Sequence, residues 1–281
     1  MKKTNKAFSL IELSIVILII GILIAGVIAG SRLISKSKRS TAANLTKTSI
    51  VPSIPDLVFW ADAASEEAFD DSVTTNSVST WYDIAPYSAN KNNATQATAA
   101  NRPTFVEGAI NGVPALRFDG VNDSLAIDGN FMSDKYYSIF IVEQRRGSTS
   151  GSYFYSPSSQ GLSFGYATST EFRFTSFSGA NDWIPITISA YTSPIAKIIS
   201  LIGQPASDPT KISNALYFNG TLQYNDTTGR INYGNSSTYN IGKNPYQGDI
   251  GELIIFKRNV KPSERADIQE YLSKKWKIAL Q

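Results

Sequence analysis

The 281-residue sequence predicts a long N-terminal helix followed by an all-β sandwich that ends in a short helix. Three observations lead to this prediction. Residues 8–30 form an apolar run with one charge. From residue 56 onward, short runs rich in Val, Ile, Phe, Tyr and Thr alternate with Gly, Asn, Asp, Ser and Pro, a pattern typical of sandwiches and barrels. Near the C-terminus, apolar residues recur at helical spacing.

The apolar run of residues 8–30 is long enough to cross a membrane. As a helix it measures ~34 Å, compared with ~30 Å for the hydrocarbon core of a bilayer. Its one charge, Glu12, would be costly inside hydrocarbon without a partner. A cut between Ala7 and Phe8 would create an α-amino group at Phe8 that could neutralise Glu12 of a neighbouring copy. The alternative is a plain signal anchor that tolerates a glutamate near its end.

The first ~35 residues resemble the class III leader of type IV pilins and type II secretion pseudopilins. The resemblance rests on a short lysine-containing leader, a small residue, Phe-Ser-Leu-Ile-Glu and a long apolar helix. It implies that a prepilin peptidase removes residues 1–7 and N-methylates Phe8, and that Glu12 serves assembly with other subunits. Ala7 stands where the family usually has glycine. The resemblance also implies a leader in the cytoplasm and a body outside the inner membrane, later in a pilus or pseudopilus.

Composition excludes several kinds of chemistry. Cysteine and histidine are both absent, so disulfides, thiolate metal sites, Ser-His-Asp triads and histidine-ligated zinc are excluded. Residues 41–281 contain 19 basic and 22 acidic side chains. This mildly acidic body has no electrostatic footprint for nucleic acid.

The residues after the apolar run read as an extension and linker, 31–55. Residues 31–49 predict a continued helix with sparse apolar positions, which is either a basic, partly flexible stalk or a helix packed on the body. The sequence I-V-P-S-I-P at 50–55 stops any helix, because it holds two prolines in four residues. We therefore place the start of the body at residue 56 and its end at residue 281.

Within the body, the pattern predicts many short strands. They are expected at 57–61, 79–83, 115–119, 138–144, 153–156, 162–166, 171–177, 184–190, 196–202, 215–219, 221–224, 239–242 and 252–257. Asn219-Gly220 between two β runs is a strong hairpin signal. Pro262 and Glu264 suit the start of the final helix, in which Ile268 and Tyr271 would pack on a sheet.

Five phrases of the body resemble laminin-G-like, concanavalin A-like lectin/glucanase domains. They lie at 57–64, 78–83, 94–105, 110–123 and 250–276. The resemblance spans about 220 residues and is strongest at both ends. It implies a jelly roll of two curved antiparallel sheets. Members bind carbohydrates or proteins, often with calcium, and some relatives cleave glycans.

The body is not expected to be an enzyme. Glucanases of this fold use paired glutamates along one strand, and a retaining reaction needs the two carboxyl groups ~5 Å apart. The sequence contains no Glu-x-Asp-x-x-Glu run. Glu252, near the end, is read as a structural hydrogen-bonding or edge residue.

Calcium is the one cofactor to consider, because D-G-V-N-D offers oxygen ligands at Asp119, Asn122 and Asp123. A plain Asx turn explains the same residues and is favoured. The tract around Asp249 is a weaker second candidate.

Aromatic side chains near turn signals are candidates for a ligand-binding platform. They are Trp183, Tyr153, Tyr155 and Tyr246. Most of the 32 aromatic residues should instead fill the core. Trp60, Trp81 and Trp276 are assigned to the core.

These predictions together favour a pilin-like filament subunit, either a minor pilin or an adhesin. Its head would bind glycans or surface proteins. One alternative is a type II secretion pseudopilin that contacts exported cargo. Another is a membrane-anchored glycan hydrolase.

Overall fold

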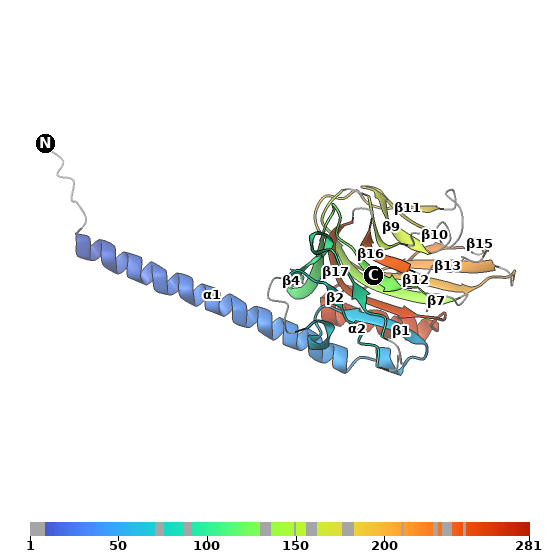
Figure 1. The fold of residues 1–281 in the computed structure, drawn as a ribbon, viewed down its shortest axis with the longest axis horizontal. Coiled ribbons are helices and arrows are strands. Elements are labelled where there is room, and N and C mark those ends of the chain that lie inside the picture. The colour runs from blue at the N-terminus through green and yellow to red at the C-terminus, as the bar shows by residue number, and fades with distance from the viewer. Residues whose placement is uncertain are drawn as a thin grey trace.

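A straight helix projects from a β-sandwich head in the computed structural model (Figure 1). The structure describes residues 9–70, 76–86, 91–129, 136–148, 150–155, 162–175, 183–208, 211–226, 230–231, 238–243 and 246–281. Structural statements below concern these residues.

Helix α1, Leu10–Lys47, is continuous over 38 residues and therefore ~57 Å long. Its N-terminal part stands clear of the head, but Ala42, Ala43 and Thr46 near its end are buried. The last part of the helix is thus packed on the body and is not a flexible stalk. A single-turn helix, η1 at Val51–Ser53, follows where the two prolines stop α1.

The head contains two sheets whose paired strands run antiparallel. The first has the order β14-β13-β12-β7-β17-β5-β4, with β1 paired to β17 and β15 to β13. Its strands are β1 Leu57–Asp62, β4 Thr104–Ile110, β5 Val113–Asp119, β7 Tyr137–Arg145, β12 Ala196–Pro205, β13 Lys211–Phe218, β14 Thr221–Asn225, β15 Arg230–Ile231 and β17 Gln247–Phe256.

The second sheet has the order β11-β10-β9-β8-β16-β6-β3-β2. Its strands are β2 Thr80–Trp81, β3 Ala94–Thr95, β6 Leu125–Asp128, β8 Gly151–Tyr155, β9 Ser163–Thr168, β10 Glu171–Thr175, β11 Ile184–Thr187 and β16 Thr238–Lys243. Two further single-turn helices are η2 Glu66–Ala68 and η3 Ala99–Asn101.

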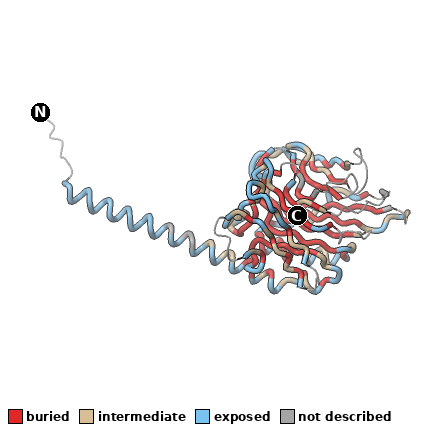
Figure 2. Tube along the Cα trace, viewed as in Figure 1, coloured by how far each residue is buried: buried red, intermediate tan, exposed pale blue. Residues whose placement is uncertain are grey.

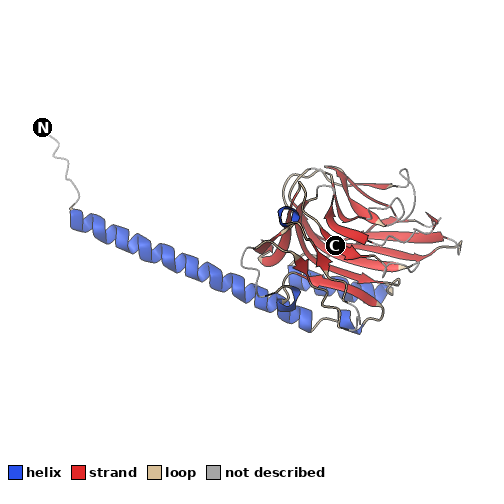
Figure 3. Cartoon of the chain, in the orientation of Figure 1, coloured by secondary structure: helices blue, strands red, loops and turns tan. Residues whose placement is uncertain are grey.

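Two apolar cores lie on opposite faces of the first sheet. On β7, Ile139 and Ile141 belong to the core between the two sheets, whereas Phe140 and Val142 face a second core. The second core is closed by α2, Pro262–Trp276, and by the end of α1. Figure 3 shows these helices on the outer side of the sheet. Burial on both faces explains the unbroken apolar run of residues 139–142 within β7.

The predicted fold class is confirmed: a long N-terminal helix precedes a β-sandwich with a C-terminal helix. The hairpin prediction is also confirmed, because Asn219 and Gly220 join β13 to β14 with φ of 48° and 86°. The three tryptophans assigned to the core, Trp60, Trp81 and Trp276, are buried. The sequence did not predict β3, β4, β6 or β15.

Candidate functional site

The start of α1 is capped by its own side chains. Ser9 Oγ accepts the Ile11 N–H at 3.3 Å, and Glu12 Oε2 accepts the Ser9 N–H at 2.9 Å. This is a capping box, which satisfies helix-end donors reciprocally. Glu12 therefore has a local partner even in a lone subunit, which lowers the cost expected for it. The Ser-x-x-Glu spacing is the sequence signal for this cap. Ala7 and Phe8 lie outside the described residues.

The first half of α1 is the candidate membrane-spanning segment. Leu10–Val27 has a mean hydropathy of 2.9 and none of it is buried. Among the described residues, it is the one helix long and apolar enough to cross a membrane. Figure 2 shows this part of α1 as exposed along its length. An apolar surface of this size needs lipid or other subunits to cover it.

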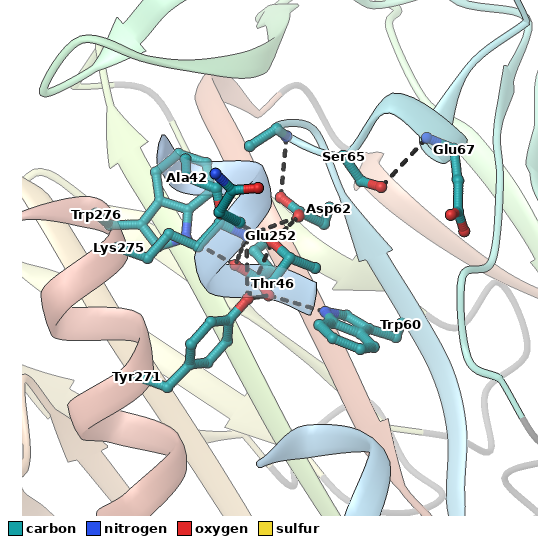
Figure 4. A network of polar contacts seen from close by, with 12 residues as sticks. Ala42, Thr46, Trp60, Asp62, Ser65, Glu67, Glu252, Tyr271, Lys275 and Trp276 are labelled. Atoms are coloured by element: carbon teal, nitrogen blue, oxygen red, sulfur yellow. Dashed lines mark hydrogen bonds and ion pairs between the residues drawn. The ribbon is translucent and has the colours of Figure 1, made fainter. Parts of the chain in front are cut away.

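A buried polar cluster joins α1 to the head (Figure 4). We call it the junction network. Its members come from α1, β1, β17 and α2. They are Thr46, Trp60, Asp62, Glu252, Tyr271, Lys275 and Trp276.

Lys275 is the cation of the junction network. Its Nζ lies 2.7 Å from Asp62 Oδ2 and 2.7 Å from Glu252 Oε2, and it donates to Thr46 Oγ1 at 2.8 Å. All three charged side chains are fully buried. Thr46 Oγ1 also donates to Asp62 Oδ2 at 2.7 Å, so a side chain of α1 contacts both members of the Lys275–Asp62 ion pair.

Both carboxylate oxygens of Glu252 accept hydrogen bonds from buried side chains. Trp60 Nε1 and Tyr271 OH donate to its Oε1, each at 2.8 Å, and Trp276 Nε1 donates to its Oε2 at 2.8 Å. Burial raises the pKa of Glu252, and the Lys275 ammonium opposes that rise. Glu252 is thus a hydrogen-bonding residue, as expected. It does not lie on an edge, because β17 runs between β5 and β7.

A second polar site opens at the surface of the head. A cavity of about 390 Å³ is lined by residues including Arg145, Tyr166, Tyr191, Lys197 and Phe218, and we call it the mouth. Arg145 lies 4.0 Å from the centroid of the Tyr166 ring, and Lys197 Nζ is 3.4 Å from Tyr166 OH. Of the described residues, no Asp or Glu side chain lines the mouth.

Glu143 is buried beneath the mouth. It accepts hydrogen bonds from Tyr166 OH at 2.9 Å and from Tyr246 OH at 3.0 Å. Burial raises the pKa of Glu143, while Lys197 and the tyrosine donors oppose the rise. Lys197 and Arg145 both line the mouth, and Lys197 acts on the buried Glu143 carboxyl.

The structure contradicts two of the four predicted platform residues, Tyr153 and Tyr246. Tyr153 and Tyr246 are buried in the core between the sheets, with ring centroids 4.8 Å apart, and cannot meet a ligand at the surface. Both residues lie near turn signals in the sequence, which led to the prediction of surface positions, but both rings point into the core. Trp183 is half-buried and lies 4.4 Å from the Arg173 guanidinium. The side chain of Tyr155 lies outside what the structure describes.

In the D-G-V-N-D turn, the aspartate side chains accept hydrogen bonds from backbone N–H groups of the turn itself. Asp119 Oδ1 accepts the N–H groups of Val121 at 2.8 Å and Asn122 at 3.2 Å. Asp123 Oδ2 accepts the Asp119 N–H at 3.0 Å, and burial raises the pKa of Asp123 to about 6. The described residues contain no group of three acidic side chains placed to hold a metal. Asp249, the second candidate, is buried and paired with Arg117 at 2.7 Å. Calcium binding stays a prediction.

Comparison with known proteins separates the two parts of the chain. Residues 2–28 match the family described as the prokaryotic N-terminal methylation motif. No match is found among curated proteins. The first half of α1 thus carries a prepilin-type sequence, and the match ends where the apolar run ends.

Three solved structures resemble the head. The binding domain of Paraclostridial Mosquitocidal Protein 1 has a TM-score of 0.52 at 16% identity, covering 78% of this chain and 52% of that one. Domain 4 of AbnA, an arabinanase from Geobacillus stearothermophilus solved with arabinotriose, has a TM-score of 0.51 at 14% identity, covering 77% and 98%. Trypanosoma rangeli sialidase in complex with sialic acid has a TM-score of 0.52 at 13% identity, covering 89% and 39%.

The chain spans about half the length of the mosquitocidal binding domain and about two fifths of the sialidase. At such identities, the likeness concerns the fold alone. The head therefore shares the β-sandwich fold of these structures and is joined to a prepilin-type N-terminus.

Proposed function

We propose that this chain is a pilin-like filament subunit, a minor pilin or adhesin, that displays a non-enzymatic binding head. The observation that carries the proposal is the methylation motif at residues 2–28, continued as one unbroken helix into a lectin-like head. In this proposal a prepilin peptidase removes residues 1–7 and methylates Phe8. Residues 8–30 hold the subunit in the inner membrane and then in the filament, and residues 56–281 form the head.

Subunit stacking would cover the exposed apolar surface of Leu10–Val27. Glu12 would then exchange its capping contact with the Ser9 N–H for the α-amino group of a neighbour's Phe8. A Glu12 carboxylate inside the membrane is already out of water, so a cationic partner offsets the cost of leaving that charge unpaired. Because the end of α1 is packed on the head through Thr46, the head would follow the helix into the assembly as a fixed body.

The mouth is the best supported ligand site of the head. Its accessible groups are Lys197 and the ring of Tyr191, both half-buried, while Arg145 and Tyr166, each 4% exposed, form its floor. Aromatic faces suit the apolar faces of sugars, and cations suit carboxylate or sulfate groups. We therefore propose a glycan or surface protein with negative charge as the ligand.

The experiment has two readouts. Mass spectrometry of the chain co-expressed with a prepilin peptidase should find an N-terminal methyl-phenylalanine at Phe8; an intact leader would contradict the processing. Glycan-array binding of the processed chain should fall at least tenfold in Lys197→Gln. The exposed Lys274→Gln is the matched control and should bind normally. Binding to no glycan or cell surface would overturn the ligand proposal, and glycan hydrolysis would contradict the non-enzymatic head.

A further inference from the structure

The junction network has the composition of a reactive centre as well as that of an ion pair. It holds a primary amine, Lys275 Nζ, 2.7 Å from a carboxyl oxygen of Asp62 and 2.7 Å from one of Glu252. All three side chains have no exposed surface. As ions they would place three charges where water cannot solvate them, and each buried ion carries a desolvation cost.

We propose that Lys275 and Asp62 condense to an intramolecular amide, with Glu252 and Thr46 transferring the protons. The bond would link β1 to α2, the first and last regular elements of the head apart from its single-turn helices. It is a covalent modification within the head, and it does not depend on what the mouth binds.

The distances place the reacting atoms close together. Since a C–O bond adds only ~1.25 Å, Nζ is within about 4 Å of Asp62 Cγ, near the ~3–3.5 Å of a near-attack geometry. Well-oriented intramolecular groups reach effective molarities of ~10⁵–10⁸ M. Exclusion of water from the site also disfavours hydrolysis of the product.

The step balances without any co-reactant. Lys275 Nζ attacks Asp62 Cγ, so the Nζ–Cγ bond forms and the Cγ–Oδ2 bond breaks. Starting from ammonium and carboxylate, Nζ loses two protons, one to Glu252 Oε2 at 2.7 Å and one to Thr46 Oγ1 at 2.8 Å. Thr46 Oγ1, 2.7 Å from Oδ2, passes a proton to it, and Glu252 supplies the second. Oδ2 leaves as water, and Glu252 ends as it began.

The surroundings would hold the developing charges. Asp62 Oδ1, which becomes the oxyanion during attack, accepts the Ala64 N–H at 2.9 Å. Glu252 is fixed by the indole N–H groups of Trp60 and Trp276, each at 2.8 Å, so that it faces the amine. Such fixed donors need no reorganisation when the reaction occurs.

The amide would also strengthen the place where load enters the head. A pull on the filament helix reaches the head through α1 and the start of β1. The chain contains no cysteine, so no disulfide can secure this point. An amide from β1 to α2 would keep the two chain ends of the head together under tension.

Mass spectrometry of the full chain, denatured and digested with trypsin, tests the proposal without any variant. The head should be lighter than its sequence by one water molecule. Residues 48–91 should be found covalently joined to residues 275–277, because trypsin cannot cut after an acylated Lys275. A full sequence mass with a linear 48–91 peptide would overturn the proposal and leave a purely ionic cluster.

Variants then test the roles of the residues. Asp62→Asn should lose ammonia in place of water and give a joined product of the same mass as the natural chain. Glu252→Gln, checked for folding by circular dichroism, should stay unlinked. Lys274→Arg, the exposed neighbour, should link normally. A linked and folded Glu252→Gln would contradict the proton-transfer role, and a linear Asp62→Asn would contradict Asp62 as the electrophile.

Discussion

Thr46→Val is the substitution that most directly tests how α1 is held on the head. Thr46 is 5% exposed, and its hydroxyl lies 2.7 Å from Asp62 Oδ2 and 2.8 Å from Lys275 Nζ. Valine keeps the branched shape of the side chain and replaces the hydroxyl with a methyl group. The perturbation therefore isolates the polar contribution of α1 to the junction network.

The expected cost follows from the two hydrogen bonds. A hydrogen bond to a charged group contributes about 1.5–3 kcal/mol. In the ionic, unlinked form of the network, Lys275 and Asp62 keep each other and their remaining partners, so the two losses do not add fully. We expect the free energy of unfolding to fall by about 2–3 kcal/mol. Thr48→Val is the control: its exposed hydroxyl donates only to the Asn44 carbonyl at 3.0 Å, and the change should be within about 0.5 kcal/mol.

Urea unfolding of the detergent-solubilised chain, followed by tryptophan fluorescence, measures the difference. Trp60 and Trp276 both donate to Glu252, so two of the four tryptophans report on the network itself. With a slope of ~2–3 kcal/mol/M, the midpoint of Thr46→Val should drop by about 1 M. Equal midpoints for Thr46→Val and Thr48→Val would refute the polar attachment of α1.

Two further substitutions probe the head. Asp249→Asn removes a buried charge paired with Arg117 at 2.7 Å and should lower stability by about 1–2 kcal/mol, seen as a loss of several degrees (~4 °C) in Tm; an unchanged Tm would contradict a stabilising pair. The pKa of Asp123 is raised from 3.8 to about 6 in the folded chain. Its contribution to the free energy of unfolding is therefore fully present below pH 3.8 and is lost as the pH rises through 6. After allowance for its partial exposure, Asp123→Asn should be about 1 kcal/mol more stable than the natural chain at pH 7 and equal to it at pH 4; a constant difference would refute this. Calcium added at pH 7 should stabilise the natural chain but not Asp123→Asn if the turn binds it.

Local pattern in the sequence was enough for much of the fold. Two-sided burial accounts for the apolar runs at 139–142 in β7 and 253–256 in β17. Asn219-Gly220 predicted its hairpin because both residues tolerate positive φ. Strand β4 escaped prediction because Gly108, with φ of 68°, shifts its pairing with β5 and interrupts the alternation. Such a bulge is set by the partner strand and leaves little trace in the local pattern.

The sites depended on contacts that no local pattern carries. Thr46, Asp62, Glu252 and Lys275 are spread over most of the chain and meet only when α1 and α2 pack on β1 and β17. Tyr246 lies beside a turn signal in the sequence, but its side chain points into the core, where its hydroxyl donates to the buried Glu143 at 3.0 Å. The motif around Glu12 could be read from the sequence, because it is contiguous.

The central claim, assembly through the N-terminal helix, is tested most directly by Glu12→Gln. Glutamine keeps an oxygen that can accept the Ser9 N–H, so the helix cap is preserved while the charge is lost. The measurement is the fraction of the processed chain found in sheared filaments relative to the membrane. The account predicts a drop of at least tenfold with normal membrane insertion and normal head folding. Incorporation equal to that of the natural chain would contradict it and leave Glu12 as a helix cap alone.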